Sequence, residues 1–174
     1  MQLEKVAPTK IDKLQAICIE AYSKNFAHHW NDNGLEIYLE NQFNTKRIAR
    51  DLDNPTLNYY FIKVKEKPIG FIKLNLKVAF DNYAANEVAE LEKMYVLPEM
   101  KGQGVGKKAL SAIIQQLKDI GKKVFFLCVI DTNVAAIKFY EKLDFQYHSK
   151  TRLEVPLFKE ELKGMHRMSM TLKN

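Results

Sequence analysis

The sequence has only two cysteines, Cys18 and Cys128, and neither belongs to a Cys-x-x-Cys motif or lies at metal-ligand spacing from a histidine. Both stand within apolar runs, which favours buried thiols and argues against a metal site. No apolar run approaches the length of a membrane span, and no apolar segment follows the first five residues as it would in a signal peptide. We therefore expect a cytoplasmic protein that uses neither a membrane nor a metal.

The chain also lacks internal repeats, low-complexity tracts and any segment with the composition of an interdomain linker. With 174 residues, of which 47% are hydrophobic and 28% charged, it has the size and composition of one ordinary globular domain, residues 1–174. Its net charge is +6, but the lysines are scattered and mostly interleaved with acids. This pattern argues against a dedicated nucleic-acid surface, although a small basic nucleic-acid-binding protein is kept as an alternative of a different class.

The first third of the sequence has a helical pattern. Thr9 is the predicted N-cap of a first helix, in which apolar residues recur at helical spacing. A second helix is expected over residues 34–43, and Thr45 is the predicted cap of a third that covers residues 46–54.

From residue 58 the pattern changes to the period of two that is typical of strands. Residues 58–66 and 69–80 alternate as an antiparallel hairpin does, and a further strand covers 89–96. After a helix ended by Gly121, the residues up to Ile130 are apolar enough for a buried parallel strand. A short helix then precedes two closing strands, over 145–155 and 165–172, with a mobile polar connection between them.

Three glycines stand at alternate positions before the fourth predicted helix, at Gly102, Gly104 and Gly106. They remove Cβ atoms from the first turn, so that a ligand can approach the backbone. No Ser, Thr, Asp or Asn is placed to cap this helix, and its first N–H groups are therefore left free. With Lys101 and Lys107 beside them, these donors are suited to phosphate oxygens.

The spacing of these glycines decides which kind of phosphate site is present. A P-loop requires a glycine at position 101 and a hydroxyl at 108, where the chain has Lys101 and Lys108, and a dinucleotide fingerprint requires a third glycine where Lys107 stands. The sequence KGQGVG over residues 101–106 instead resembles the acetyl-coenzyme A loop of the GNAT N-acetyltransferase superfamily, with Lys101 where the family usually has Arg or Gln. Lysine keeps the charge of arginine but loses its bidentate fork.

A second motif follows about 30 residues later and is similar to another GNAT signature, Asn-x-x-Ala-x-x-Phe/Leu-Tyr-x-Lys-x-Gly-Phe. Residues 133–145 match it except at Asp144, which replaces a glycine that ends a helix. The resemblance covers most of the chain from residue 58 onward. It implies a mixed α/β (α+β) fold with a mostly antiparallel sheet of six or seven strands flanked by helices, in which the fourth and fifth strands are parallel and splayed.

The same resemblance implies acetyl-coenzyme A as the cosubstrate and an N-acetyltransferase activity. Asn133 is expected to bond the pantetheine amides, and Lys142 to assist at the nucleotide phosphates. The residues expected to bind the cosubstrate are Met94, Tyr95, Val96, Lys101, Gly102, Gln103, Gly104, Val105, Gly106, Lys107, Asn133, Tyr140 and Lys142.

Acetyl transfer to an amine makes three chemical demands. A protonated amine cannot attack the thioester. With a reference ammonium pKa of about 10.4, neutralising the acceptor amine at pH 7 costs roughly 4–5 kcal/mol, so a base or a water relay must accept its proton. Glu90 and Glu92 are the candidates, since they are two residues apart on one strand and so lie on one face unless a bulge intervenes. Glu92 is slightly favoured, and the alternative is that at least one of the two only balances Lys93 or a neighbouring strand lysine. A backbone N–H near Met94–Val96 would bind the oxyanion. Tyr140 would donate to the departing thiolate, as the resemblance implies.

The acceptor is the part that the sequence leaves open. The two motifs look similar to those of bacterial spermidine/diamine acetyltransferases, which suggests a polyamine, while the net positive charge argues mildly against one. Other small amines and peptide amines stay open, as do a homodimer and a coenzyme A-binding module without catalysis. His28, His29 and Trp30 either border the acceptor pocket or belong to an ordinary loop.

Overall fold

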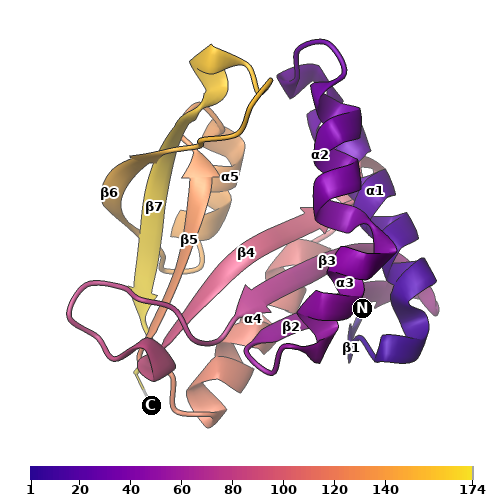
Figure 1. Ribbon diagram of the computed structural model, residues 1–174. Helices are drawn as coiled ribbons and strands as arrows, with labels where there is room; N and C mark the ends of the chain where they lie inside the picture. Colours follow the sequence, from indigo (N-terminus) through magenta and orange to yellow (C-terminus); the bar gives the residue numbers. More distant parts are fainter. Residues whose placement is uncertain (174) are drawn as a thin grey trace.

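A computed structural model describes residues 1–173 and shows one seven-stranded mixed sheet flanked by helices, with the strand order β1-β2-β3-β4-β5-β7-β6 (Figure 1). The strands are β1 (Gln2–Lys5), β2 (Leu57–Val64), β3 (Lys67–Asn75), β4 (Val88–Val96), β5 (Val124–Ile130), β6 (Gln146–Arg152) and β7 (Gly164–Thr171). The α-helices are α1 (Ile11–Phe26), α2 (Gly34–Phe43), α3 (Thr45–Asp53), α4 (Val105–Asp119) and α5 (Val134–Glu141). The mixed, mostly antiparallel sheet confirms the predicted fold class.

The sheet is built from two antiparallel groups joined by one parallel pair. Strands β1 to β4 form an antiparallel meander, and β4 and β5 pair in parallel. The last strand, β7, pairs antiparallel with both β5 and β6 and so lies between them. The sequence predicted the closing strands but not this order, since nothing in a strand's own pattern states which neighbour it will pair with.

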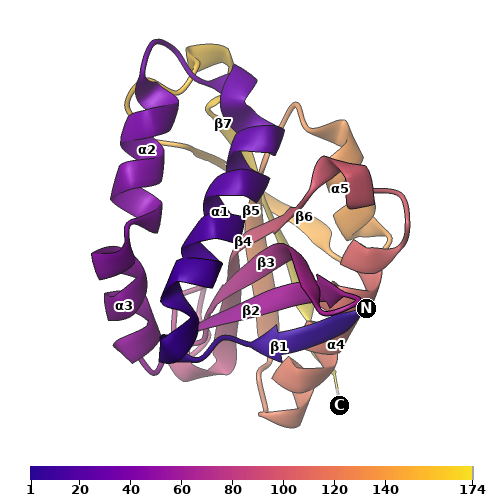
Figure 2. The ribbon, with the colours of Figure 1, turned by 90° about the vertical axis from the view of Figure 1, so that its right-hand side faces the viewer.

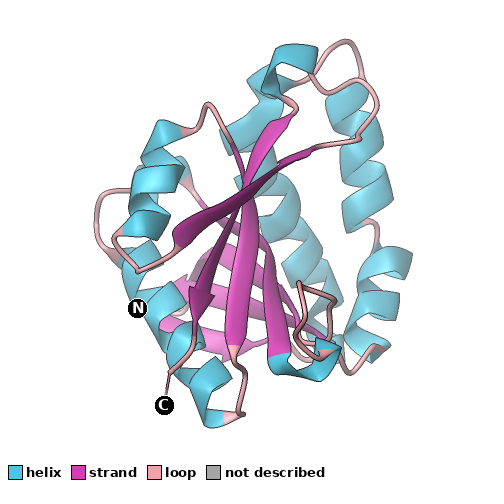
Figure 3. Ribbon diagram, turned by 90° about the vertical axis from the view of Figure 1, so that its left-hand side faces the viewer, coloured by secondary structure: helices cyan, strands magenta, loops and turns pink. Residues whose placement is uncertain are grey.

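Helices cover both faces of the sheet. Figures 2 and 3 show α1, α2 and α3 on one face and α4 on the opposite face. The core under α1 to α3 contains Leu14, Ile48 and Phe71, and the core under α4 contains Leu110 and Ile113 with apolar side chains of β3, β4 and β5. The predicted helical stripe of α1 is buried as expected, because burial of apolar surface fixes the helix on the sheet.

Two of the predicted helix caps are wrong. Thr9 lies inside a 3₁₀ turn, η1 (Pro8–Lys10), and α1 begins after it without a side-chain cap. Thr45 is already the first residue of α3, and Asn44 is its cap, because the Asn44 Oδ1 atom accepts a hydrogen bond of 2.8 Å from the Arg47 N–H. The asparagine stands three residues before that donor, which is the geometry that an N-cap requires.

The connection between β6 and β7, predicted to be mobile, is packed against the rest of the chain. Phe158 is buried and its ring meets that of Trp30 edge-on at 5.0 Å. The Asn31 N–H donates to the Leu157 carbonyl at 2.9 Å, and the Lys159 N–H donates to the His29 carbonyl at the same distance. These contacts fix the connection to the segment that follows α1. Its polar composition gave no sign of this packing.

Two left-handed helix ends agree with the sequence. Gly121 has a φ of +76° after α4, and Asp144 has a φ of +67° where the related motif carries glycine. The Phe145 N–H closes this second turn on the Tyr140 carbonyl at 3.2 Å. Within residues 1–173, no helix combines the length and the apolar character that crossing a bilayer demands, and no group of three or more His, Cys, Asp or Glu side chains is arranged to hold a metal ion.

Candidate active site

The parallel strands β4 and β5 separate part-way along their length (Figure 1). Their pairing ends at Leu91 opposite Leu127, yet β4 continues to Val96 and β5 to Ile130. Each strand beyond this point stays with its other neighbour, β4 with β3 and β5 with β7. The edge of β4 that faced β5 is therefore without a strand partner over residues 92–96. A cavity of about 860 Å³ opens at this separation.

The glycine loop forms one wall of the cavity. Gly102 and Gly104 have φ values of +78° and +73°, and a Cβ built on either would meet no heavy atom within 4 Å. Gly104 is the residue before α4, and no side chain caps this helix. The N–H groups of its first turn are thus free toward an open cradle, the arrangement that binds phosphate oxygens at helix N-termini.

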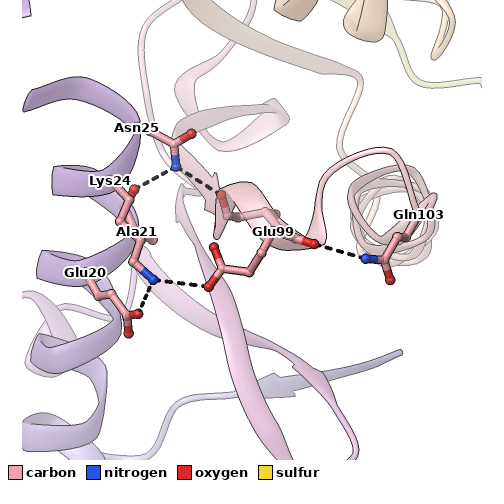
Figure 4. Close-up of polar contacts among 7 residues, drawn as sticks. Glu20, Ala21, Lys24, Asn25, Glu99 and Gln103 are labelled. Atoms are coloured by element: carbon pink, nitrogen blue, oxygen red, sulfur yellow. Dashed lines mark hydrogen bonds and ion pairs between the residues drawn. The ribbon is translucent and has the colours of Figure 1, made fainter. Parts of the chain in front are cut away.

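The C-terminal end of α1 is tied to this loop and to the end of β4 (Figure 4). The Asn25 amide donates to the Ala21 carbonyl at 2.7 Å and to the Val96 carbonyl at 3.0 Å. The Lys101 ammonium donates to the Asn25 side-chain oxygen. Beside it, Gln103 donates to the Glu99 carbonyl at 3.1 Å. These bonds hold the glycine loop against α1.

Helix α5 presents Asn133 and Tyr140 to the cavity. The Asn133 Oδ1 atom caps α5 by accepting from the Ala136 N–H at 3.1 Å, so that its amide NH₂ is the group left for a ligand. Burial raises the pKa of the Tyr140 hydroxyl to about 12, and the phenol therefore stays protonated at neutral pH. Lys142 is exposed at the end of α5 and does not line the cavity.

Both candidate glutamates line the cavity, but a bulge separates their surroundings. Lys73 of β3 lies opposite Lys93, and the next residue of β3 lies opposite Leu91, so that Glu92 is the extra residue of β4. The Glu92 carboxylate forms a 2.7 Å ion pair with the buried Lys73 ammonium. Glu90 forms no ion pair among the residues described; burial raises the pKa of its carboxyl, and the Glu92 charge raises it further.

Aromatic side chains from α1 and its neighbours form the rest of the cavity wall. Tyr22 stacks on Tyr38 with ring centroids 4.6 Å apart and on Phe26 at 5.0 Å, and it meets Tyr95 edge-on at 5.3 Å. Trp30 also lines the cavity, whereas His28 and His29 do not. Of the segment over 28–30, only the tryptophan therefore lines the cavity.

The cavity brings together most of the residues predicted from sequence. Gln103 and Lys142 are the two predicted cosubstrate residues that do not line it, and Cys128, expected to be buried, is half-exposed on its wall. The lining residues that the sequence did not single out include Tyr22, Phe26, Tyr38, Gln42, Lys93, Leu153, Val155, Phe158 and Met165. The aromatic ones look like ordinary core positions, because their helical spacing is the same as that of the residues that pack on the sheet.

Residues 16–145, more than half of the chain, match the model of the acetyltransferase (GNAT) family. The chain belongs to the GNAT acetyltransferase family. Both sequence motifs, at residues 101–106 and 133–145, lie within the part of the chain that matches the family. In this GNAT member the splayed strands, the uncapped start of α4 and the tyrosine of α5 meet at one cavity.

Several known proteins are similar to this GNAT member. An uncharacterized N-acetyltransferase of Methanocaldococcus jannaschii is 30% identical over 99 residues, which cover 57% of this chain and 42% of that one. Spermine/spermidine N(1)-acetyltransferase of Bacillus subtilis is 30% identical over 83 residues, which cover 47% of this chain and 55% of that one. The matched part thus spans about half the length of these two relatives.

The fold has solved counterparts. The crystal structure of PaiA N-acetyltransferase from Thermoplasma acidophilum in complex with coenzyme A superimposes with a TM-score of 0.77 at 18% identity, over 98% of this chain and 99% of that one. At this identity the likeness shows the fold alone, which agrees with the splayed mixed sheet described above.

Proposed function

We propose that this protein transfers an acetyl group from acetyl-coenzyme A directly to a primary amine, without a covalent enzyme intermediate. The observation that carries the proposal is the meeting of three features in one cavity: a helix start free to bind phosphate, a carboxyl group with a raised pKa, and a protonated tyrosine. Family membership supports the same reaction class.

The residues of the cavity fit the cosubstrate. The uncapped start of α4, with Gly102 and Gly104 open to a close approach, would hold the pyrophosphate, and Lys107 would add charge there. The free edge of β4 over 94–96 and the Asn133 amide would hold the pantetheine arm. Bound acetyl-coenzyme A supplies the thioester carbonyl that an amine attacks.

Glu90 is the better base of the two glutamates. A base must be unprotonated at the working pH yet basic enough to accept a proton, and a carboxyl with a raised pKa is closer to this balance than an ordinary one. Glu90 has such a shift because it is buried and close to Glu92. Glu92 is engaged with Lys73 at 2.7 Å, so the slight sequence-based preference for Glu92 is reversed in this proposal.

Tyr140 serves the departing thiolate chiefly as a hydrogen-bond donor. Its pKa of about 12 lies roughly 3.5 units above that of an ordinary thiol, so a full proton transfer costs about 5 kcal/mol before the thiolate itself is perturbed. A hydrogen bond to a charged acceptor stabilises the developing charge without that cost. The oxygen of the thioester carbonyl would meet a backbone N–H of the free β4 edge near Met94.

The acceptor proposed at this level is a small primary amine that enters along the aromatic wall. Spermidine and spermine stay candidates because one relative is named as a spermine/spermidine N(1)-acetyltransferase. The rival function within the same fold is a coenzyme A-binding module without catalysis.

The experiment measures thiol release from acetyl-coenzyme A against a panel of amines: spermidine, spermine, lysine peptides, aminoglycosides and simple alkylamines. We expect turnover with at least one of them, reduced on the order of a hundredfold or more in Glu90→Gln and clearly reduced in Tyr140→Phe, while calorimetric binding of acetyl-coenzyme A is retained in both. Binding without turnover across the panel would favour the non-catalytic module, and unchanged turnover in both variants would remove the assigned roles.

A further inference from the structure

Glu92, which lines the cavity, belongs to a cluster of charged groups that neutralise one another. Asp51 of α3 lies 3.1 Å from the Arg47 guanidinium and 2.9 Å from the Lys73 ammonium, and Lys73 also contacts Glu92 at 2.7 Å. Two cations and two carboxylates are thereby joined in one cluster without net charge. Glu92 is therefore not a free anion to which a cationic acceptor could bind.

Lys93 is the next residue of β4, and it lines the same cavity. It lies directly opposite Lys73 in the strand register, so the two side chains leave the sheet on the same side. None of the ion pairs formed among residues 1–173 includes the Lys93 ammonium, and the neighbouring Glu92 carboxylate pairs with Lys73 instead. The cavity thus contains a lysine that has no ion-pair partner among the described residues.

The surroundings of Lys93 disfavour the charged form of its side chain. The pKa of its ammonium is lowered to about 8, first by burial and then by the nearby Lys73 charge, while the Glu92 charge opposes the shift. Arg47 and the Cys18 thiol are the other titratable groups that act on it. A ligand anion beside Lys93 would restore the interaction that water provides elsewhere, because an opposite charge favours the charged form of a desolvated lysine.

Arg167 is a second cation whose charge acts on Glu90. The Arg167 guanidinium of β7 lies over the Phe126 ring, 5.9 Å from its centroid, and forms no ion pair among the described residues. Its buried Nε atom has no hydrogen-bond partner. The Lys93 and Arg167 charges both act to lower the pKa of the Glu90 carboxyl, so Glu90 is not an isolated anion that would attract a polycation.

We propose that Lys93 binds a carboxylate of the acceptor, so that the amine acetylated at this site belongs to a molecule that also carries an acid group. This inference rests on the acetyl transfer proposed above and names its substrate class. In the resulting complex Lys93 holds the carboxylate, Glu90 accepts the proton of the ammonium, and the aromatic wall of Tyr22, Phe26 and Tyr38 packs on the carbon chain between them.

The test compares amines in matched pairs that differ only in the carboxylate: alanine with ethylamine, phenylalanine with phenethylamine, and lysine with cadaverine. Spermidine is added as the polycation. Thiol release gives kcat/KM for each member with the wild type, Lys93→Gln, Lys93→Arg and Lys77→Gln. Lys77 is exposed and outside the cavity, so its variant removes the same charge at a distance.

We expect at least one pair in which the wild type prefers the carboxylate-bearing member by about tenfold or more, as one charged contact in a desolvated site provides. Lys93→Gln should lose this preference through a raised KM, Lys93→Arg should retain most of it, and Lys77→Gln should leave it unchanged. The comparison between variants cancels the different basicities of the paired amines. Binding of acetyl-coenzyme A should be equal in all four proteins.

Two results would overturn the inference while leaving acetyl transfer intact: a wild type that favours cadaverine or spermidine over every carboxylate-bearing amine, or a preference that Lys93→Gln does not change. Failure of every amine to release thiol from a protein that binds acetyl-coenzyme A would overturn both this inference and the proposed function.

Discussion

Replacement of Gly104 by alanine separates the two roles that the structure gives to this residue. Its φ of +73° is unfavourable for any residue with a Cβ, and its position before α4 places it at the proposed phosphate cradle. Because nothing lies within 4 Å of a Cβ built there, the added methyl group meets no protein atom. The variant should therefore fold, with a strain of about 1–2 kcal/mol.

The expected loss of affinity follows from the contacts that the methyl group would displace. A charge-assisted hydrogen bond from a helix N–H to a phosphate oxygen contributes about 1.5–3 kcal/mol, so the loss of one raises the Kd for coenzyme A about 10- to 150-fold. Strain in the free protein does not mimic this effect. From a typical stability of at least 5 kcal/mol, a loss of 2 kcal/mol leaves more than about 99% of the molecules folded.

Gly121 provides the matched control at the other end of the same helix. It has a φ of +76°, is exposed, and likewise has no heavy atom within 4 Å of where a Cβ would stand, but it does not line the cavity. Gly104→Ala and Gly121→Ala should lower the urea midpoint by similar amounts, and only the first should weaken coenzyme A binding in calorimetry. Equal affinities in the two variants would refute the cradle at the start of α4.

Three further predictions concern the acids, the buried cluster and a helix end. Glu90→Gln should remove the acidic limb of the kcat/KM pH profile, since a base with a raised pKa is protonated and inactive as the pH falls through that value; an unchanged limb would assign it to another group. Lys73→Met should lower the free energy of unfolding by about 3–5 kcal/mol, and Tm by roughly 6–20 °C, because Asp51 and Glu92 lose their shared buried cation. Calorimetry measures this loss, and a loss of stability below about 1 kcal/mol would contradict the prediction. Asp144→Gly should stabilise the protein by about 0.5–1 kcal/mol by relieving a φ of +67°, whereas a lower urea midpoint would show that the aspartate side chain has a stabilising contact.

The sequence predicted the parts of the site that depend on local geometry. The alternate glycines, the absent cap of α4 and the left-handed turn at Asp144 are each decided within a few residues, and the structure has all of them. The acceptor side was not predictable in the same way. Trp30 and Phe158 meet through a connection that is 128 residues away along the chain, and Lys93 shares the cavity with Tyr22 only because α1 packs on β3 and β4.

The bulge at Glu92 shows why the order of residues on β4 could not assign the roles of the two acids. In a regular strand, Glu90 and Glu92 would share one face and Lys93 would lie on the other. One extra residue in β4 keeps Glu92 beside Lys73 and also brings Lys93 to the same side, opposite Lys73 in the register. Glu92, the acid slightly favoured from the sequence, is thereby paired with a cation, and a lysine that a regular strand would place on the opposite face becomes part of the cavity. The same bulge lies where β4 has parted from β5, so the strand edge proposed to meet the thioester and the charges proposed to meet the acceptor lie at one irregularity of β4.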